Sequence, residues 1–130
     1  MKSKLNKYQI ERFSRQIILK KIGILGQKKI VNSKVLIVGM GGLGCPAAEF
    51  LARAGVGLLG IIDYDKVDLS NLHRQSLYSN KDLNRFKVNV VKSKLNQINP
   101  DTKIIPYRIK ANKNNFEKIL KNYDFIIDGS

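Results

Sequence analysis

Short apolar runs alternate with amphipathic stretches along most of the chain. Runs of apolar residues bounded by polar or turn residues predict strands at 35–38, 58–62, 103–109 and 125–127. Apolar residues at helical spacing predict helices at 46–54, at 86–98 and around 116–120. Between them lies a polar stretch, 64–84, that shows no clear period. The pattern therefore alternates strand and helix, as in an α/β protein.

The first part of the chain has a different pattern. Residues 5–32 predict two short helices, with breaks at Gly23 and Gly26. We therefore expect an N-terminal helical segment, residues 1–33, followed by a nucleotide-binding α/β domain, residues 34–130. The expected fold is a Rossmann-like, doubly wound, mostly parallel sheet. Because the chain stops at Ser130, directly after the fourth predicted strand, we expect this domain to be truncated there.

Composition narrows the class of protein. The single cysteine, Cys45, allows no intrachain disulfide, and no apolar run reaches the roughly 20 residues that span a bilayer. The polar N-terminus lacks the apolar stretch of a signal peptide, so we expect a cytoplasmic protein that does not bind a membrane. The net charge is +14, but it comes mostly from lysine spread along the chain. That spread favours solvated surfaces over nucleic-acid binding, with an acidic partner protein as the alternative.

A glycine-rich loop follows the first predicted strand and opens a helix. It contains Gly39, Gly41, Gly42 and Gly44. Glycines in this position let a phosphate approach backbone N–H groups at the start of a helix. Asp63 ends the second strand, where a carboxylate accepts hydrogen bonds from ribose hydroxyls. Together they predict a nucleotide site, with an NAD- or FAD-dependent oxidoreductase among the alternatives.

The residues after Asp63 favour a triphosphate over a dinucleotide. Asp65, Asn71 and Arg74 lie in the polar stretch, and Arg74 offers a fork of donors suited to phosphate. Lys87 opens the next predicted helix, where the helix dipole disfavours a cation, as expected of a functional lysine. Arg12 and Arg15, one helical turn apart, form a second candidate cationic patch.

Several segments together resemble the ThiF/MoeB/HesA family of adenylating enzymes, which are related to ubiquitin-activating enzymes. They are Arg12-Phe13-Ser14-Arg15-Gln16, the glycine loop, Ile62-Asp63-Tyr64-Asp65, Ser70-Asn71-Leu72-His73-Arg74-Gln75 and Lys87. The resemblance implies that Mg-ATP adenylates the C-terminal glycine carboxylate of a Gly-Gly-tailed, ubiquitin-like sulphur-carrier protein, for molybdopterin or thiamine synthesis. Pyrophosphate is released. The carboxylate is already ionised, so no general base is needed.

The same resemblance implies roles for single residues. Asp63 would hold the ribose, and Asn71, Arg74 and Lys87 the phosphates, while Arg15 would reach the ATP of the partner in a homodimer. The catalytic residues would be Arg74, Lys87 and Arg15. The family's magnesium-binding aspartate would fall just beyond Ser130, with Asp128 as its neighbour, and a zinc site would need a longer chain.

Three expectations concern the remaining candidates. Cys45 is expected to be a small packing residue behind the phosphate loop, and His73 a positioning or packing residue of the arginine segment. No metal ligand set is expected within the 130 residues. A non-catalytic nucleotide-binding fragment remains an alternative, and we expect weak or absent pyrophosphate exchange from these residues alone.

Overall fold

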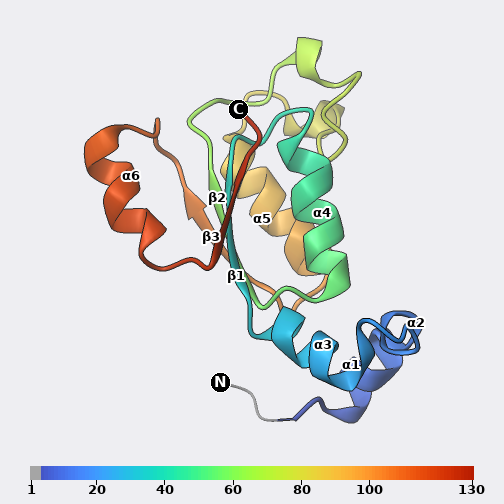
Figure 1. The fold of residues 1–130 in the computed structure, drawn as a ribbon. Helices are drawn as coiled ribbons and strands as arrows, with labels where there is room; N and C mark the ends of the chain where they lie inside the picture. Colours follow the sequence, from blue (N-terminus) through green and yellow to red (C-terminus); the bar gives the residue numbers. More distant parts are fainter. Residues whose placement is uncertain (1–3) are drawn as a thin grey trace.

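A four-stranded parallel sheet forms the centre of the molecule in the computed structural model, which describes residues 4–130 (Figure 1). Its strands are β1 (Lys34–Val38), β2 (Leu58–Ile62), β3 (Lys103–Tyr107) and β4 (Phe125–Asp128). Their spatial order is β3-β2-β1-β4, and every neighbouring pair is parallel. The expected Rossmann-like α/β fold is confirmed. Because the chain leaves β1 in one direction and returns to its other side as β4, a topological switch point lies between these two strands.

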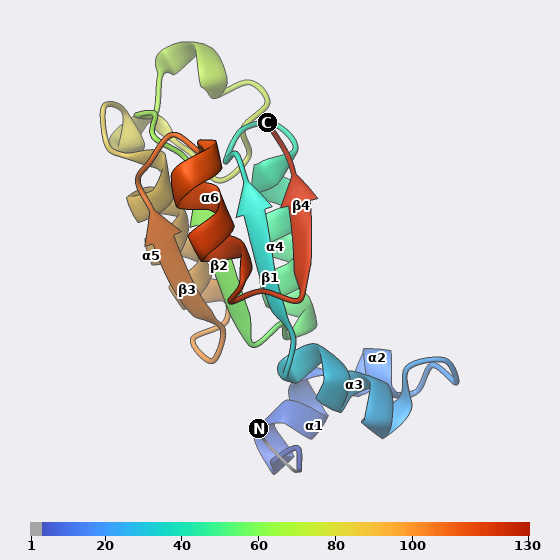
Figure 2. The same cartoon turned by 60° about the vertical axis from the view of Figure 1, so that its left-hand side comes forward.

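Helices cover both faces of the sheet. Helices α4 (Gly44–Ala54) and α5 (Lys87–Ile98) pack on one face, and α6 (Lys113–Leu120) lies on the other (Figures 1 and 2). The apolar runs of β1 and β2 are buried as predicted, with Leu36, Ile37, Leu59 and Ile61 fully inaccessible. Helix α4 begins two residues before the predicted start, and β3 ends two residues before the predicted end.

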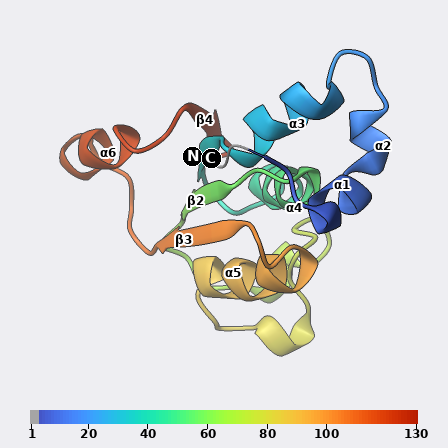
Figure 3. The same ribbon diagram turned by 90° about the horizontal axis from the view of Figure 1, so that it is seen from below.

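The N-terminal segment forms three helices where the pattern predicted two. They are α1 (Lys7–Arg12), α2 (Ser14–Ile17) and α3 (Gly23–Val31), and they lie beyond the amino ends of the strands (Figures 1 and 3). The predicted break at Gly26 is wrong, because Gly26 lies inside α3. Gly23 does mark a boundary: it begins α3 with a φ of +59°, a conformation that favours glycine.

Polar side chains dock this segment onto α4 and α5. Gln16 and Gln27 both donate to the carbonyl of Ala54, at the end of α4. The Arg12 guanidinium donates to the carbonyl of Ile98, at the end of α5. The expected cationic patch of Arg12 with Arg15 is therefore wrong, because Arg12 is turned onto the protein and satisfies the end of a helix.

The polar stretch after β2 is an ordered loop with paired ends. Lys66 and Phe86 form an antiparallel bridge, and Val67 N–H donates to the Arg85 carbonyl at 2.8 Å. Two short 3-10 turns lie inside it, Leu69–Asn71 and Asn80–Asp82. We call residues 66–86 the arginine loop, because it carries Arg74. Among residues 4–130, no helix has the length and apolar character needed to cross a bilayer.

Candidate functional site

A cavity of about 430 Å³ lies at the carboxyl ends of the strands, at the switch point between β1 and β4. Its lining comes from segments that follow all four strands, and includes Gly39, Gly41, Asp63, Asp65, Lys87 and Gly129. Open α/β sheets bind ligands in this position, because the loops that leave the strands diverge there. The structure thus brings five of the predicted site residues to one cavity.

The glycine loop turns tightly enough to exclude side chains at two positions. A Cβ on Gly44 would lie 1.7 Å from the carbonyl oxygen of Gly39, and Gly39 itself has a φ of +94°. The loop therefore folds back on itself, so that α4 begins directly beside the end of β1. Gly42 has more room, because a Cβ there would lie 3.8 Å from the side chain of Arg74.

Backbone donors of the glycine loop are left for a ligand. Within residues 4–130, the N–H groups of Gly41, Gly42 and Leu43 donate to no protein acceptor. Helix α4 has no side-chain N-cap and no acidic residue in its first turn. A helix N-terminus with free N–H groups and no carboxylate attracts an anion such as phosphate.

Asp63 connects the end of β2 to the glycine loop. One carboxylate oxygen accepts the N–H of Met40 at 2.8 Å, and the other accepts the N–H of Asp65 at 2.8 Å. A carboxylate has about four acceptor positions, so it still has capacity for ribose hydroxyls. Asp63 therefore holds the glycine loop, and ribose binding by its carboxylate stays a prediction.

Lys87 is a nearly buried cation that faces the cavity. Its side chain is 5% exposed, and no ion pair to it is found in the described part of the chain. Its backbone N–H donates to the carbonyl of Asp65 at 3.0 Å, which fixes the start of α5 beside the end of β2. Buried charges are ordinarily paired, so this ammonium is suited to an anionic ligand.

Arg74 and Asn71 lie outside the lining of this cavity. The Arg74 side chain packs against Gly42 and donates to the Ser70 carbonyl at 3.1 Å, and it is otherwise exposed. The Asn71 side-chain oxygen accepts the N–H of Asp68 at 3.0 Å, which caps a 3-10 turn. His73 lies next to Arg74, 3.5 Å between ring nitrogen and guanidinium. The arginine loop thus presents Arg74 on the outer side of the glycine loop.

Arg15 lies far from the cavity of its own chain. It is exposed on α2, at the opposite end of the sheet from the glycine loop (Figure 1). Its predicted role is therefore compatible only with the site of another subunit.

The sequence patterns missed a cluster behind the glycine loop. Tyr78 donates its hydroxyl to the carbonyl of Met40 at 2.6 Å, and both side chains are buried. Gln75 is 4% exposed and packs against Gly41. Gln75 ends the family-like segment from Ser70 to Gln75, but no role was predicted for it from the sequence. Cys45 is fully buried in the core as expected, and burial raises the pKa of its thiol, so it is not a reactive thiolate.

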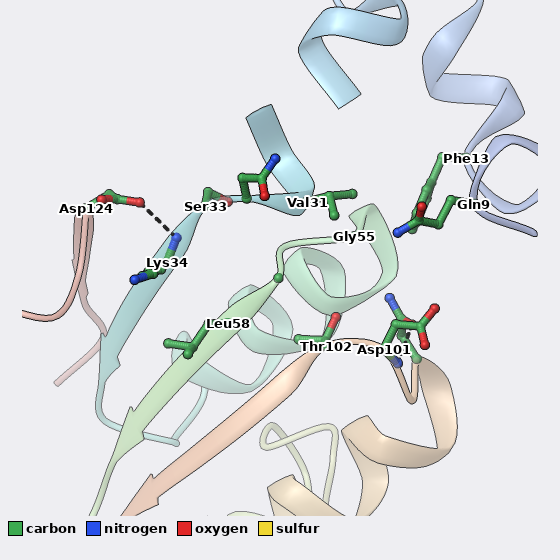
Figure 4. A pocket seen from close by; sticks show the side chains of 13 residues that line it. Gln9, Phe13, Val31, Ser33, Lys34, Gly55, Leu58, Asp101, Thr102 and Asp124 are labelled. Carbon is green, nitrogen blue, oxygen red and sulfur yellow. Dashed lines mark hydrogen bonds between the residues drawn. The ribbon is translucent and has the colours of Figure 1, made fainter. Parts of the chain in front are cut away.

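A larger cavity, of about 620 Å³, lies at the other end of the molecule. It is bounded by the N-terminal helices and the amino ends of the strands, with Phe13, Gly55 and Thr102 among its lining residues (Figure 4). It contains neither the glycine loop nor Lys87. The smaller cavity is therefore the candidate nucleotide site, despite its size.

Comparison with known proteins places these features in a family. The model of the ThiF family matches residues 13–130. An adenylyltransferase and sulfurtransferase MOCS3 from Aedes aegypti is 46% identical over 128 residues, which is 98% of this chain. A probable molybdopterin-synthase adenylyltransferase from Gracilaria tenuistipitata var. liui is 43% identical over 126 residues, 97% of the chain.

A solved structure has the same fold. The E. coli tRNA N6-threonylcarbamoyladenosine dehydratase TcdA, in complex with ATP, superposes with a TM-score of 0.86 and 26% identity, over 96% of this chain and 51% of that one. The chain spans 29% of the length of the Aedes aegypti relative and 36% of the Gracilaria relative.

Proposed function

Because this chain belongs to the ThiF family, we propose that it forms the ATP-binding part of an adenylyltransferase. The acceptor is the C-terminal glycine carboxylate of a ubiquitin-like sulphur-carrier protein that ends in Gly-Gly. The names of the Aedes aegypti and Gracilaria relatives support adenylyl transfer, and the Gracilaria name supports the molybdopterin branch. The E. coli structure that contains ATP supports the nucleotide.

The observation that carries the proposal is Lys87. Its ammonium is nearly buried, has no ion pair within residues 4–130, and lines the same cavity as Gly39, Gly41 and Asp63. A dehydrogenase site needs the glycine loop and the ribose carboxylate, but it has less use for a desolvated cation here. A triphosphate supplies the missing negative charge, and a desolvated cation stabilises it strongly.

The chemistry requires charge stabilisation and little proton transfer. A carboxylate oxygen of the carrier tail attacks the α-phosphorus of ATP, the bond from that phosphorus to the bridging oxygen breaks, and pyrophosphate leaves with the electron pair. The products are an acyl-adenylate and pyrophosphate. Lys87 and the N–H groups of the glycine loop stabilise the negative charge of the phosphates during this step. Asn71 and Arg74 lie outside the cavity lining, so we propose that they reach the phosphates from the outer side of the glycine loop.

We propose that magnesium enters this site together with the nucleotide. Residues 4–130 contain no cluster of three or more His, Cys, Asp or Glu side chains that could hold a metal ion. Mg²⁺ commonly binds substrate phosphates and water with one or two carboxylates. We therefore assign no step to a metal held by these residues, and propose that the ion arrives with ATP.

Arg74→Ala tests the proposal in the complete gene product. We expect ATP–pyrophosphate exchange, in the presence of a Gly-Gly-tailed carrier, to fall by roughly 10²–10³, the loss typical of one charge-stabilising donor. The melting temperature should not change, because the Arg74 side chain is exposed and its hydrogen bonds within residues 4–130 go to its own loop. Arg53→Ala, which removes an exposed arginine paired with Glu49 on α4, is the matched control. Equal exchange in both variants would refute the role of Arg74.

A further inference from the structure

Both backbone polar groups of Met40 are held by protein side chains. The Met40 N–H, in the peptide after Gly39, donates to Asp63 at 2.8 Å. The Met40 carbonyl, in the peptide before Gly41, accepts the Tyr78 hydroxyl at 2.6 Å. The Cys45 thiol makes a longer contact of 3.5 Å with the same carbonyl. Met40 is fully buried, so water does not compete for these bonds.

The hydrogen bond from Tyr78 to the Met40 carbonyl determines the direction of the Gly41 N–H, which we expect to bind phosphate. The peptide between Met40 and Gly41 is trans and planar, so the Met40 carbonyl and the Gly41 N–H point in opposite directions. When Tyr78 holds the carbonyl on the buried side, the Gly41 N–H is turned away from Tyr78. Gly41 lines the cavity, and its N–H has no acceptor within the described residues.

Tyr78 also contacts the site cation. The Lys87 ammonium nitrogen lies 5.9 Å from the centre of the Tyr78 ring, within the range of a cation–π interaction. One side chain thus touches both groups that are expected to face phosphate: its hydroxyl orients the glycine loop, and its ring lies beside Lys87.

We propose that Tyr78 is a positioning residue for phosphate binding, which aligns the Gly41 N–H through the Met40 carbonyl and places the Lys87 ammonium against its ring. This inference rests on the proposed ATP site and deepens it. Burial raises the pKa of Tyr78 far above its ordinary value, so the hydroxyl remains a donor throughout the pH range of any assay. Tyr78 acts through these two groups and does not itself line the cavity.

Tyr78→Phe separates the two contacts, because it removes the hydroxyl and keeps the ring. We expect calorimetric titration of the 130-residue chain to show ATP affinity reduced about tenfold, as for loss of one strong hydrogen bond, and adenosine affinity unchanged. Tyr78→Leu, which also removes the ring, should weaken ATP binding further.

Tyr123→Phe is the matched control. The Tyr123 hydroxyl bonds to that of Tyr107 at 2.8 Å, and neither tyrosine lines the cavity, so its loss should leave ATP affinity unchanged. The Gly41 amide resonance should shift in Tyr78→Phe and remain in place in Tyr123→Phe, which detects the loop without any ligand.

The outcomes distinguish two failures. If the unsubstituted chain binds ATP and Tyr78→Phe binds it equally well, with an unmoved Gly41 resonance, the positioning role is wrong and the ATP site stands. If Tyr78→Phe weakens adenosine and ATP equally, its effect is on the fold in general, which also refutes the role. If the unsubstituted chain binds ATP no more tightly than adenosine, the proposed function is wrong, and the inference is overturned with it.

Discussion

Single residues in the glycine loop have different reasons to be glycine. Gly44 is constrained by the protein itself, because a Cβ would overlap the Gly39 carbonyl. Gly42 is not constrained in this way, since the nearest side-chain atom to its Cβ position is 3.8 Å away. The spacing of glycines in the sequence does not distinguish these positions. The structure shows that the fold requires glycine at Gly44 and leaves room for a side chain at Gly42.

Gly44→Ala and Gly42→Ala should therefore differ in stability. We expect Gly44→Ala to lower the free energy of unfolding by about 3–5 kcal/mol, because backbone must move to admit the methyl group. Gly42→Ala should change it by less than about 1 kcal/mol. Urea denaturation followed by circular dichroism measures both, and equal stabilities would show that the tight approach of Gly44 to Gly39 is not present in solution.

At the same scale, the sequence predicted the residues of the cavity better than their contacts. Gly39, Gly41 and Asp63 were predicted from their spacing and Lys87 from its position at the start of a helix, and all four line one cavity. Tyr78 was not predicted, because a tyrosine in an aperiodic polar stretch carries no hydropathy signal. Its role depends on a bond to a residue 38 positions away, which no local pattern encodes.

At the scale of elements, the arginine loop is held by a buried carboxylate. Asp82 is 1% exposed and bonds to the Lys94 ammonium at 2.9 Å and to the Ser79 N–H at 2.9 Å. Burial raises the pKa of Asp82, but the bonds from Lys94 and Ser79 outweigh it, so the net pKa is lowered. Since Lys94 belongs to α5, this pair ties the end of the loop to the helix that begins with Lys87.

Asp82→Asn should destabilise the protein in a pH-dependent way. We expect a loss of about 3–5 kcal/mol at pH 7, typical of removing one partner of a buried ion pair. A carboxyl with a lowered pKa in the folded state stabilises above its ordinary pKa, and this contribution disappears as the pH falls through the lowered value. The difference from the unsubstituted chain should therefore shrink below about pH 4.

Urea denaturation at pH 7 and at pH 3 checks this expectation, with Glu49→Gln as the control. Glu49 pairs with Arg53 on the exposed side of α4, and its loss should cost less than about 1 kcal/mol. A difference for Asp82→Asn that stays constant from pH 7 to pH 3 would contradict the assigned ion pair.

The strands and long helices were predictable because their apolar periodicity is strong. The helical character of the N-terminal segment was predicted, but the number of its helices was not, because α1 and α2 have only six and four residues and depend on docking. Gln16 and Gln27, which fix that docking on Ala54, are polar residues that a hydropathy pattern assigns to the surface. The paired ends of the arginine loop depend on contacts between residues about twenty positions apart.

At the scale of the whole molecule, the two candidate arginines lie at opposite ends. Arg74 is beside the glycine loop, and Arg15 is beyond the amino ends of the strands (Figure 1). We propose that Arg15 acts in a second subunit of a homodimer, so that each site contains residues from two chains.

Mixing inactive variants tests this arrangement in the complete gene product. Arg15→Ala and Lys87→Ala should each lose pyrophosphate exchange. If Arg15 acts across the interface, a mixed dimer contains one intact site, so an equal mixture should recover about a quarter of the unsubstituted activity. The same mixture should remain inactive if Arg15 serves its own chain. Each variant taken alone through the same mixing procedure is the control.

The central claim is that the cavity at the switch point binds the phosphates of ATP through Lys87 and the glycine loop. Calorimetric titration of the 130-residue chain with ATP and with NAD⁺, repeated on Lys87→Met, tests it most directly. We predict that ATP binds at least about tenfold more tightly than NAD⁺, and that Lys87→Met abolishes this preference because the paired charge is lost. Tighter binding of NAD⁺ than ATP, or an unchanged ATP affinity in Lys87→Met, would contradict the claim.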